Sequence, residues 1–446
     1  MRSILLLLIL VGSVPFCLVN PYYGVLMWFW TSYFNPHRFT WGFTYNLPVA
    51  LIVAVPTILG TLFCKKSLRS LLTREAVLLL GLWLWYAISY VNALGEPNFE
   101  GHMVEASYEI NHISKIFLMM FIMIMVITTR QKLHGVLLVS AGSLGLLALK
   151  GTLFGLRTSG EFRVFGPPDS FLTDNNAFGL AVNVSLPILF FLAREETIRW
   201  RRSVLYTLFG AGVTSVLLTY SRGGLLGLAM VLGLIMLRSR HKTLSVIALA
   251  TSAFLVLSFA PDSWMNRMSQ FAAGNLDATA NQRLVSWGTA WRFAHDYPVA
   301  GGSFDALPDV AIYQRYQPRP LPDGLVSSGP HSIYFQLLAD QGFIGVALFL
   351  VLIASCFWTL FRVRRLARQI PSAGWMINHT FMIEASMIAF MTSGAFLGFA
   401  YLDLIYQMIG IVVILKMLLR KEIESYLRLP SEKSAVERLE EAQVLA

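Results

Sequence analysis

Long apolar runs recur along the whole chain, separated by short polar stretches. Most are long enough to cross a hydrocarbon core of about 30 Å as a helix. The twelve runs are 4–19, 46–64, 75–95, 114–129, 133–152, 175–193, 203–220, 223–237, 243–260, 332–361, 375–400 and 403–419. The pattern predicts an all-α polytopic membrane protein with about 12 transmembrane helices.

Two amino-terminal segments need separate treatment. Residues 1–20 mimic a signal peptide, but they lack a convincing small-x-small cleavage site, so we expect an uncleaved first helix. The stretch 22–34 is apolar, short and rich in aromatic residues. We favour a re-entrant or interfacial segment for it. The alternative is that it crosses the membrane, which would change the side of the amino terminus alone.

Cationic residues predict the orientation of the spans. Five cationic clusters, 65–69, 130–132, 199–202, 238–242 and 362–365, occupy alternate loops. The positive-inside rule puts them in the cytoplasm together with the carboxyl-terminal tail. The loops 35–45, 96–113, 153–174, 220–223 and 261–330 then lie outside. We expect four parts: 1–260 with the first nine spans, 261–330 as a large helical periplasmic loop subdomain, 331–420 with the last spans, and 421–446 as a cytoplasmic tail.

The composition agrees with a membrane protein and excludes other classes of protein. Only 13% of the residues are charged and the mean hydropathy is +0.60, whereas a soluble domain carries roughly 25% charged residues. The net charge of +10 lies largely in short loops, where it sets topology and contacts anionic lipid, so it does not indicate nucleic acid. The three cysteines have no metal-binding or disulfide spacing.

Arg222 is the most informative outer cation, because the positive-inside bias disfavours it. It lies in Thr219-Tyr220-Ser221-Arg222-Gly223-Gly224 with almost no loop around it. A guanidinium at the membrane boundary costs free energy unless it is paired, and a lipid diphosphate would pair it in a bidentate manner. An anchor for lipid headgroups is the alternative. The glycines would let a backbone or a ligand approach closely.

A second cation and a histidine could complete a site. Arg283 opens a predicted amphipathic helix in which Arg283, Trp287 and Trp291 share one stripe; it could be a second phosphate clamp or an ordinary loop cation. His331 follows Ser327-Ser328-Gly329-Pro330 at the start of a span. Ser327 or Ser328 could cap that helix, and the helix dipole would favour a neutral imidazole, as a general base requires.

Two further cations are weaker candidates for the site. Arg163 and Lys150 could face the same cavity, and Glu384 is the one acidic residue that we place well inside a span. The outer loops lack a convincing carboxylate cluster for a divalent metal, so no metal and no cofactor is expected. No nucleotide-binding motif or Gly-x-Ser-x-Gly elbow occurs, so the substrate itself must carry the driving energy.

Together these stretches resemble the O-antigen ligase family. The resemblance rests on 219–224, on Gln282-Arg283 and Gly301-Gly302-Ser303-Phe304, on the stretch from His331 through Asp340-Gln341-Gly342, and on Asp174-Asn175-Asn176-Ala177-Phe178. The stretch 20–39 also resembles a subgroup of O-glycosylation ligases associated with exosortase systems. The resemblance covers about 160 to 350.

The resemblance implies a metal-independent glycosyltransferase of the helical membrane (GT-C-like) class in the bacterial inner membrane. Its donor would be an undecaprenyl-diphosphate-linked glycan, and its acceptor lipid A-core or another periplasmic glycan or protein. The family's two essential arginines and one histidine would fall on Arg222, Arg283 and His331. An O-antigen polymerase, a protein O-glycosylation ligase and a lipid-linked glycan transporter are the alternatives.

Overall fold

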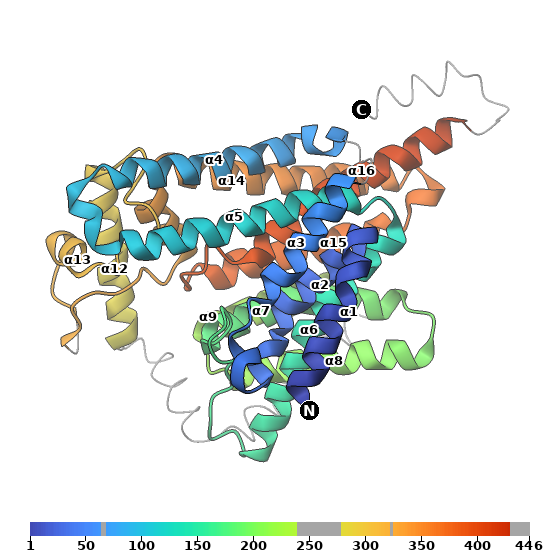
Figure 1. The fold of residues 1–446 in the computed structure, drawn as a ribbon, viewed down its shortest axis with the longest axis horizontal. Helices are drawn as coiled ribbons and strands as arrows, with labels where there is room; N and C mark the ends of the chain where they lie inside the picture. The colour runs from blue at the N-terminus through green and yellow to red at the C-terminus, as the bar shows by residue number, and fades with distance from the viewer. Residues whose placement is uncertain (64–67, 239–277, 322–323, 429–446) are drawn as a thin grey trace.

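The chain folds into a bundle of long helices (Figure 1). The computed structural model describes residues 1–63, 68–238, 278–321 and 324–428. Within them the α-helices are α1 (Arg2–Val19), α2 (Pro21–Phe34), α3 (Val49–Phe63), α4 (Arg74–Leu94), α5 (Met103–Val126), α6 (Arg130–Arg157), α7 (Asn175–Glu195), α8 (Arg199–Leu218), α9 (Arg222–Arg238), α12 (Ala278–Asp296), α13 (Val310–Tyr316), α14 (Ile333–Ala367), α15 (Met376–Gly394) and α16 (Asp403–Arg428). The 3-10 helices are η1 (Pro36–Phe39), η2 (Gly42–Asn46), η3 (Leu68–Leu72), η4 (Pro97–His102) and η6 (Pro371–Ala373). The described residues form no strand, which confirms the all-helical prediction for them.

Every apolar run that falls in the described residues corresponds to a helix; the run 243–260 lies outside them. Six helical segments there are long and apolar enough to cross a membrane unaided: 2–19, 74–94, 97–126, 130–157, 175–195 and 333–367. The chain is thus a helical membrane protein, while about twelve crossings stays a prediction. The last helix continues to Arg428, beyond the predicted end of its apolar run.

Cationic side chains gather at one end of the bundle, as the orientation rule requires. Arg130 lies 3.9 Å from Glu195, and the guanidinium groups of Arg238 and Arg364 both stack on the ring of Phe381. Lys416, in the second half of α16, pairs with the buried Glu75 at 2.8 Å. We call this the cation-rich end. The clusters around 65–67 and 239–242 lie outside the described residues.

The segment 22–34 runs between the two ends of the bundle. At the start of α2, the Lys132 ammonium lies 5.7 Å from the ring centre of Tyr22, near the cation-rich end. At its finish, Ser32 donates a hydrogen bond to Asp403, where α16 begins at the opposite end. The choice between a re-entrant or interfacial segment and a crossing one stays a prediction. The Arg2 guanidinium at the start of α1 lies 5.2 Å from the ring centre of Trp41, which follows α2.

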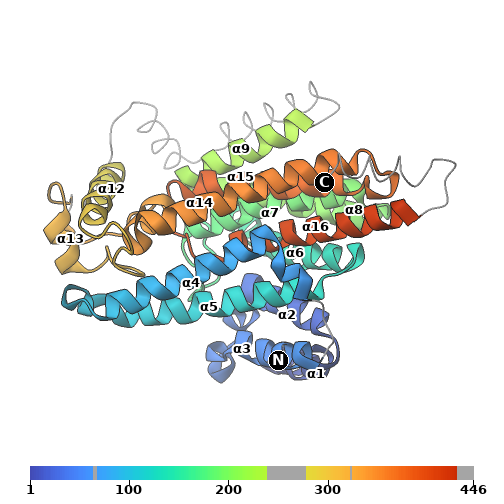
Figure 2. The same cartoon turned by 90° about the horizontal axis from the view of Figure 1, so that it is seen from above.

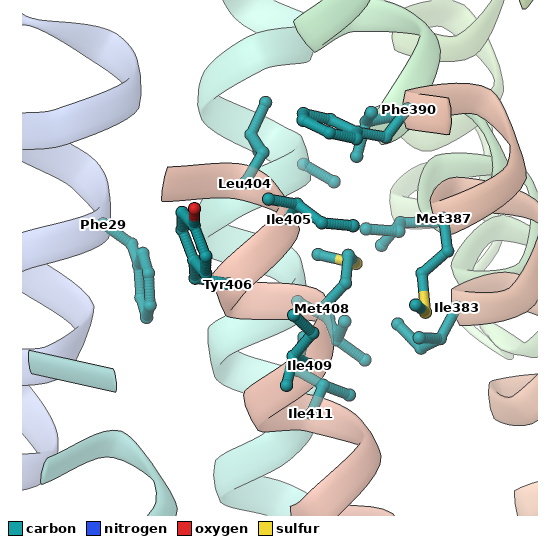
Figure 3. Packing of buried hydrophobic residues seen from close by; sticks show 14 of the residues in the cluster. Phe29, Ile383, Met387, Phe390, Leu404, Ile405, Tyr406, Met408, Ile409 and Ile411 are labelled. Carbon is teal, nitrogen blue, oxygen red and sulfur yellow. The ribbon is translucent and has the colours of Figure 1, made fainter. Parts of the chain in front are cut away.

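The centre of the bundle is formed by α15 and α16 (Figure 3). Met387 and Phe390 of α15 face Ile405 and Ile409 of α16, and all four side chains are fully buried. Phe29 of α2 is also buried and lies on the opposite side of α16. Lipid tails are as apolar as these side chains, so close van der Waals contact stabilises this core more than exclusion from water does.

A small subdomain covers the end opposite the cation-rich one. Helices α12 and α13 lie there across the ends of α4 and α14 (Figures 1 and 2). Phe293, Leu307 and Tyr313 are buried in a separate apolar cluster that also includes Phe99 of η4 and Ala339 of α14. The described residues 278–321 and 324–330 thus pack on the ends of these helices, while a separate periplasmic subdomain over 261–330 stays a prediction; residues 261–277 lie outside the described part.

Candidate functional site

Arg222 is the first residue of α9, at the end of the bundle opposite the cation-rich end. The turn before it is held by local hydrogen bonds, since the Ser221 hydroxyl accepts one from the Gly224 amide at 3.0 Å. Helix α7 fixes the chain on both sides of this turn. Its Asn175 side chain donates to the Thr219 carbonyl at 2.8 Å, and its Asn183 side chain donates to the Gly224 carbonyl at 2.7 Å. The position of Arg222 is therefore set by two helices and a capped turn.

The glycines after Arg222 accommodate protein neighbours. A β-carbon on Gly223 would lie 3.3 Å from the β-carbon of Phe396, just beyond α15. One on Gly227 would collide with the Ser393 hydroxyl. The predicted close approach is confirmed for Gly223, whose close partners are the end of α15 and the segment after it, whereas Gly224 lies against Ser221 and Val216.

Arg283 lies in the first half of α12, on the predicted stripe. One turn further, the Trp287 indole N–H donates to the Pro330 carbonyl at 2.8 Å, and its ring stacks on Phe335 of α14 with centres 5.1 Å apart. Gln282 donates to the Ser328 hydroxyl at 2.7 Å. This face of α12 therefore lies along the segment that contains His331.

His331 adopts an unusual backbone conformation immediately before α14. Its φ angle is 45°, in the left-handed region that non-glycine residues seldom occupy. The helix cap is Ser332, and Ser328 bonds Gln282 instead. The expected capping by Ser327 or Ser328 is therefore wrong. Positive-φ strain at a non-glycine residue persists only where its surroundings enforce it.

The charges around His331 show which groups it faces. Surrounding protein lowers the pKa of the imidazole although the ring retains access to solvent. The Arg283 guanidinium lowers this pKa further, and the Asp174 carboxylate opposes the shift. The predicted preference for the neutral form is confirmed in direction, with desolvation as its main cause. Asp174 caps α7, accepting from the Asn176 and Ala177 amides at 2.8 and 3.1 Å.

One segment connects the three predicted site residues. Phe396 packs against Gly223, beside Arg222, and its ring centre lies 6.3 Å from that of Trp287, one turn from Arg283. Two residues on, Gly398 lies against the His331 backbone, its β-carbon position being 3.6 Å from the His331 nitrogen. The elements that carry Arg222, Arg283 and His331 thus converge on 396–398.

The two weaker candidates are placed differently. The backbone beside Arg163 pairs with α8, since the Val164 amide donates to the Leu218 carbonyl at 3.0 Å. The charge of Arg163 also opposes the rise in the pKa of buried Tyr220, so Arg163 lies near the turn before Arg222. The Lys150 ammonium instead lies 4.1 Å from the ring centre of Phe39, beside the amino-terminal helices.

Two further stretches of the family resemblance pair with each other. The Gly302 amide donates to the Ala339 carbonyl at 2.9 Å, and the buried Asp340 carboxylate accepts from Tyr401 at 2.9 Å. Asp340 lies inside a predicted span, so Glu384 is not the only acidic residue there. Asp340 could have been found from the sequence, because it lies in the predicted span 332–361. These stretches attach the subdomain to the bundle.

We expect Gly342→Ala to destabilise the protein at this contact between the subdomain and the bundle. Gly342 has a φ of 64°, and an added β-carbon would lie 2.3 Å from the Val299 carbonyl oxygen. The strain and the collision together should destabilise the protein by several kcal/mol, on the order of the largest single-residue effects. Thermal unfolding in detergent measures this. The control is Gly142→Ala on α6, where a β-carbon meets no atom within 4 Å; equal melting temperatures for both variants would contradict the prediction.

Comparison with known proteins adds a family assignment to this geometry. Residues 207–350 match the O-antigen ligase family. Residues 1–197 match a family of unknown function, DUF5935, and no curated protein matches the chain. The O-antigen ligase match includes Arg222, Arg283 and His331, and it confirms the resemblance drawn from the motifs. The chain therefore carries an O-antigen ligase domain across residues 207–350.

Proposed function

We propose that this protein transfers a glycan from undecaprenyl diphosphate to an acceptor hydroxyl, without a metal, at the periplasmic face of the bacterial inner membrane. The observation that carries the proposal is the convergence on 396–398 of the elements bearing Arg222, Arg283 and His331. The O-antigen ligase match over the same region supports the choice of reaction.

The arginines would stabilise the leaving group. When the acceptor oxygen attacks the anomeric carbon, the bond from that carbon to the phosphate oxygen breaks and its electrons remain on the diphosphate. Negative charge on the diphosphate therefore grows in the transition state. Guanidinium groups fixed by α9 and α12 would stabilise that charge more in the transition state than in the bound donor.

His331 would act as the general base. Its lowered pKa leaves the imidazole neutral at physiological pH, so it can take the proton of the acceptor hydroxyl as the new bond forms. The imidazolium produced would then be stabilised by Asp174, whose charge already favours the protonated form. Arg163, beside the turn before Arg222, could assist with the diphosphate.

A defined transfer assay tests this proposal. The purified protein in lipid nanodiscs would receive undecaprenyl-diphosphate glycan and a candidate acceptor, and the glycan on each lipid would be followed by mass. We expect loss of the lipid-linked donor together with a glycosylated acceptor. An intact donor pool with every acceptor class offered would refute the proposal.

O-antigen polymerase activity is the second candidate, because it uses the same donor and would need the same arginines. The assay separates the two reactions. Polymerisation lengthens the glycan that remains on undecaprenyl diphosphate, whereas ligation moves the glycan to a different molecule.

A further inference from the structure

A large cavity lies beside the proposed site, on the side of the amino-terminal helices. Its volume is about 730 Å³, within the range of ligand-binding pockets. The walls come from α2, η1, α3, α5, the loop 169–172 and the segment 398–403. No local pattern in the sequence indicates this cavity, because its walls come from segments that are far apart along the chain.

The cavity is amphipathic. Apolar side chains of α3, of α5 and of Leu47 just before α3 form one part of its wall: Leu47, Val49, Ala50, Leu51, Ala54, Ile58, Ile116, Leu118 and Met119. Polar and charged side chains form another: Asn35, His37, Arg38, Glu109, His112, Lys115, Asp169, Ser170, Asp305 and Asp403. Such a lining suits a molecule that has a hydrocarbon chain and a polar head.

Two polar atoms in this wall lack protein partners. The imidazole Nδ1 of His37 and the Nε of Arg38 are buried and have no hydrogen-bond partner within the described part of the chain. His37 is only 9% exposed, and burial lowers its pKa to about 4, so the ring is neutral. A buried polar atom without a partner costs free energy that a ligand hydroxyl would offset.

The polar head is better matched by sugar than by phosphate. The wall carries four carboxyl groups, those of Glu109, Asp169, Asp305 and Asp403, against two cationic groups, those of Arg38 and Lys115. This excess of carboxyl groups disfavours a diphosphate. Carboxylates and neutral imidazole accept hydrogen bonds from hydroxyl groups. The anionic part of the donor therefore belongs at Arg222 and Arg283.

The cavity is continuous with the segment that supports His331. Gln336 and Gly398 both line it, and the β-carbon position of Gly398 is 3.6 Å from the Cα atom of His331. A hydrogen bond fixes the Gln336 side chain, whose oxygen accepts from the Ala400 amide at 3.0 Å. A hydroxyl bound at the Gly398 side of the cavity would thus be next to the backbone of the proposed base.

We propose that this cavity binds the acceptor, and that the acceptor is a membrane-anchored glycan. Its lipid chain would lie between α3 and α5, and its sugar would contact His37 and the carboxyl groups, with one hydroxyl directed toward His331. The inference rests on the proposed glycan transfer. It gives the region 1–197, which matches a family of unknown function, the role of selecting the acceptor.

Ala54→Phe tests the apolar half of the cavity. The added ring would occupy space that the acceptor's lipid chain needs. The KM for a lipid-anchored acceptor should rise at least about tenfold, the change expected when roughly two methylene groups lose burial. The KM for undecaprenyl-diphosphate glycan should stay unchanged. Val55→Phe is the matched control, since the neighbouring Val55 is 45% exposed and does not line the cavity.

His37→Phe tests the polar half with a ring of similar volume, in case the first variant folds poorly. It should raise the KM for the same acceptor and leave the KM for the donor unchanged. A rise in the donor KM instead would assign the cavity to the polyprenyl chain, and unchanged kinetics in both variants would exclude a substrate site; either result overturns the inference. If the unaltered protein transfers no glycan, that result refutes the proposed function itself and not only the assignment of the cavity.

Discussion

His331→Ala is expected to lower the rate of glycan transfer about 10²- to 10⁴-fold, the range for loss of a general base. The donor should still bind with its usual affinity, because the proposed diphosphate contacts come from α9 and α12. Single-turnover transfer measured in nanodiscs, together with donor binding, separates these two effects. His331→Ala with near-normal transfer would show that another group removes the proton.

The pH profile gives an independent readout of the same base. Burial and Arg283 lower the pKa of His331 below that of an ordinary histidine. The neutral, reactive form therefore persists to lower pH, and activity should fall only as the pH drops through this lowered pKa. Arg283→Gln removes one lowering influence, so the acid limb of the remaining activity should move to higher pH. An acid limb that stays in place in Arg283→Gln would argue against this electrostatic coupling.

Arg222→Ala and Arg283→Ala are each expected to lower the transfer rate by about 10²- to 10³-fold, the scale for loss of one electrostatic donor to a developing anion. The effect should appear in kcat as well as in donor affinity, since the charge to be stabilised grows in the transition state. Lysine at either position should restore part of the rate, because it keeps the charge but loses the bidentate geometry.

Controls for the arginine variants come from cations placed elsewhere. Lys150→Ala should leave donor affinity nearly unchanged, since Lys150 contacts Phe39 beside the amino-terminal helices. Arg163→Ala should have an intermediate effect through the turn before Arg222. Full-speed transfer by Arg222→Ala with unchanged donor affinity would remove the diphosphate clamp from the mechanism.

The apolar pattern was sufficient to predict the helices. Runs of apolar residues have few alternatives to a membrane-spanning helix, because lipid offers no hydrogen-bond partners to the backbone. Every run in the described residues is accordingly a helix. The charges of Arg130, Arg238 and Arg364 were likewise sufficient to predict which helix ends meet. Both signals are local, and each is repeated many times along the chain.

The candidate site was predicted only as a set of separate residues. Arg222 stood out because a cation between two apolar runs is costly, and His331 because it precedes a span. Neither signal shows that Phe396 packs between α9 and α12, or that the charge of Asp174 acts on the imidazole. Such contacts join loops that are far apart in sequence, and no periodic pattern encodes them.

The sequence by itself determined the membrane setting, the helices, the orientation signal and the residues able to carry the chemistry, because each depends on short stretches of chain and their transfer to lipid. The tertiary structure alone decided that α2 runs between both ends of the bundle, that Gly302 docks on Ala339, and that an amphipathic cavity adjoins His331. These features depend on side chains from distant helices fitting together, and that fit is settled only when the bundle packs.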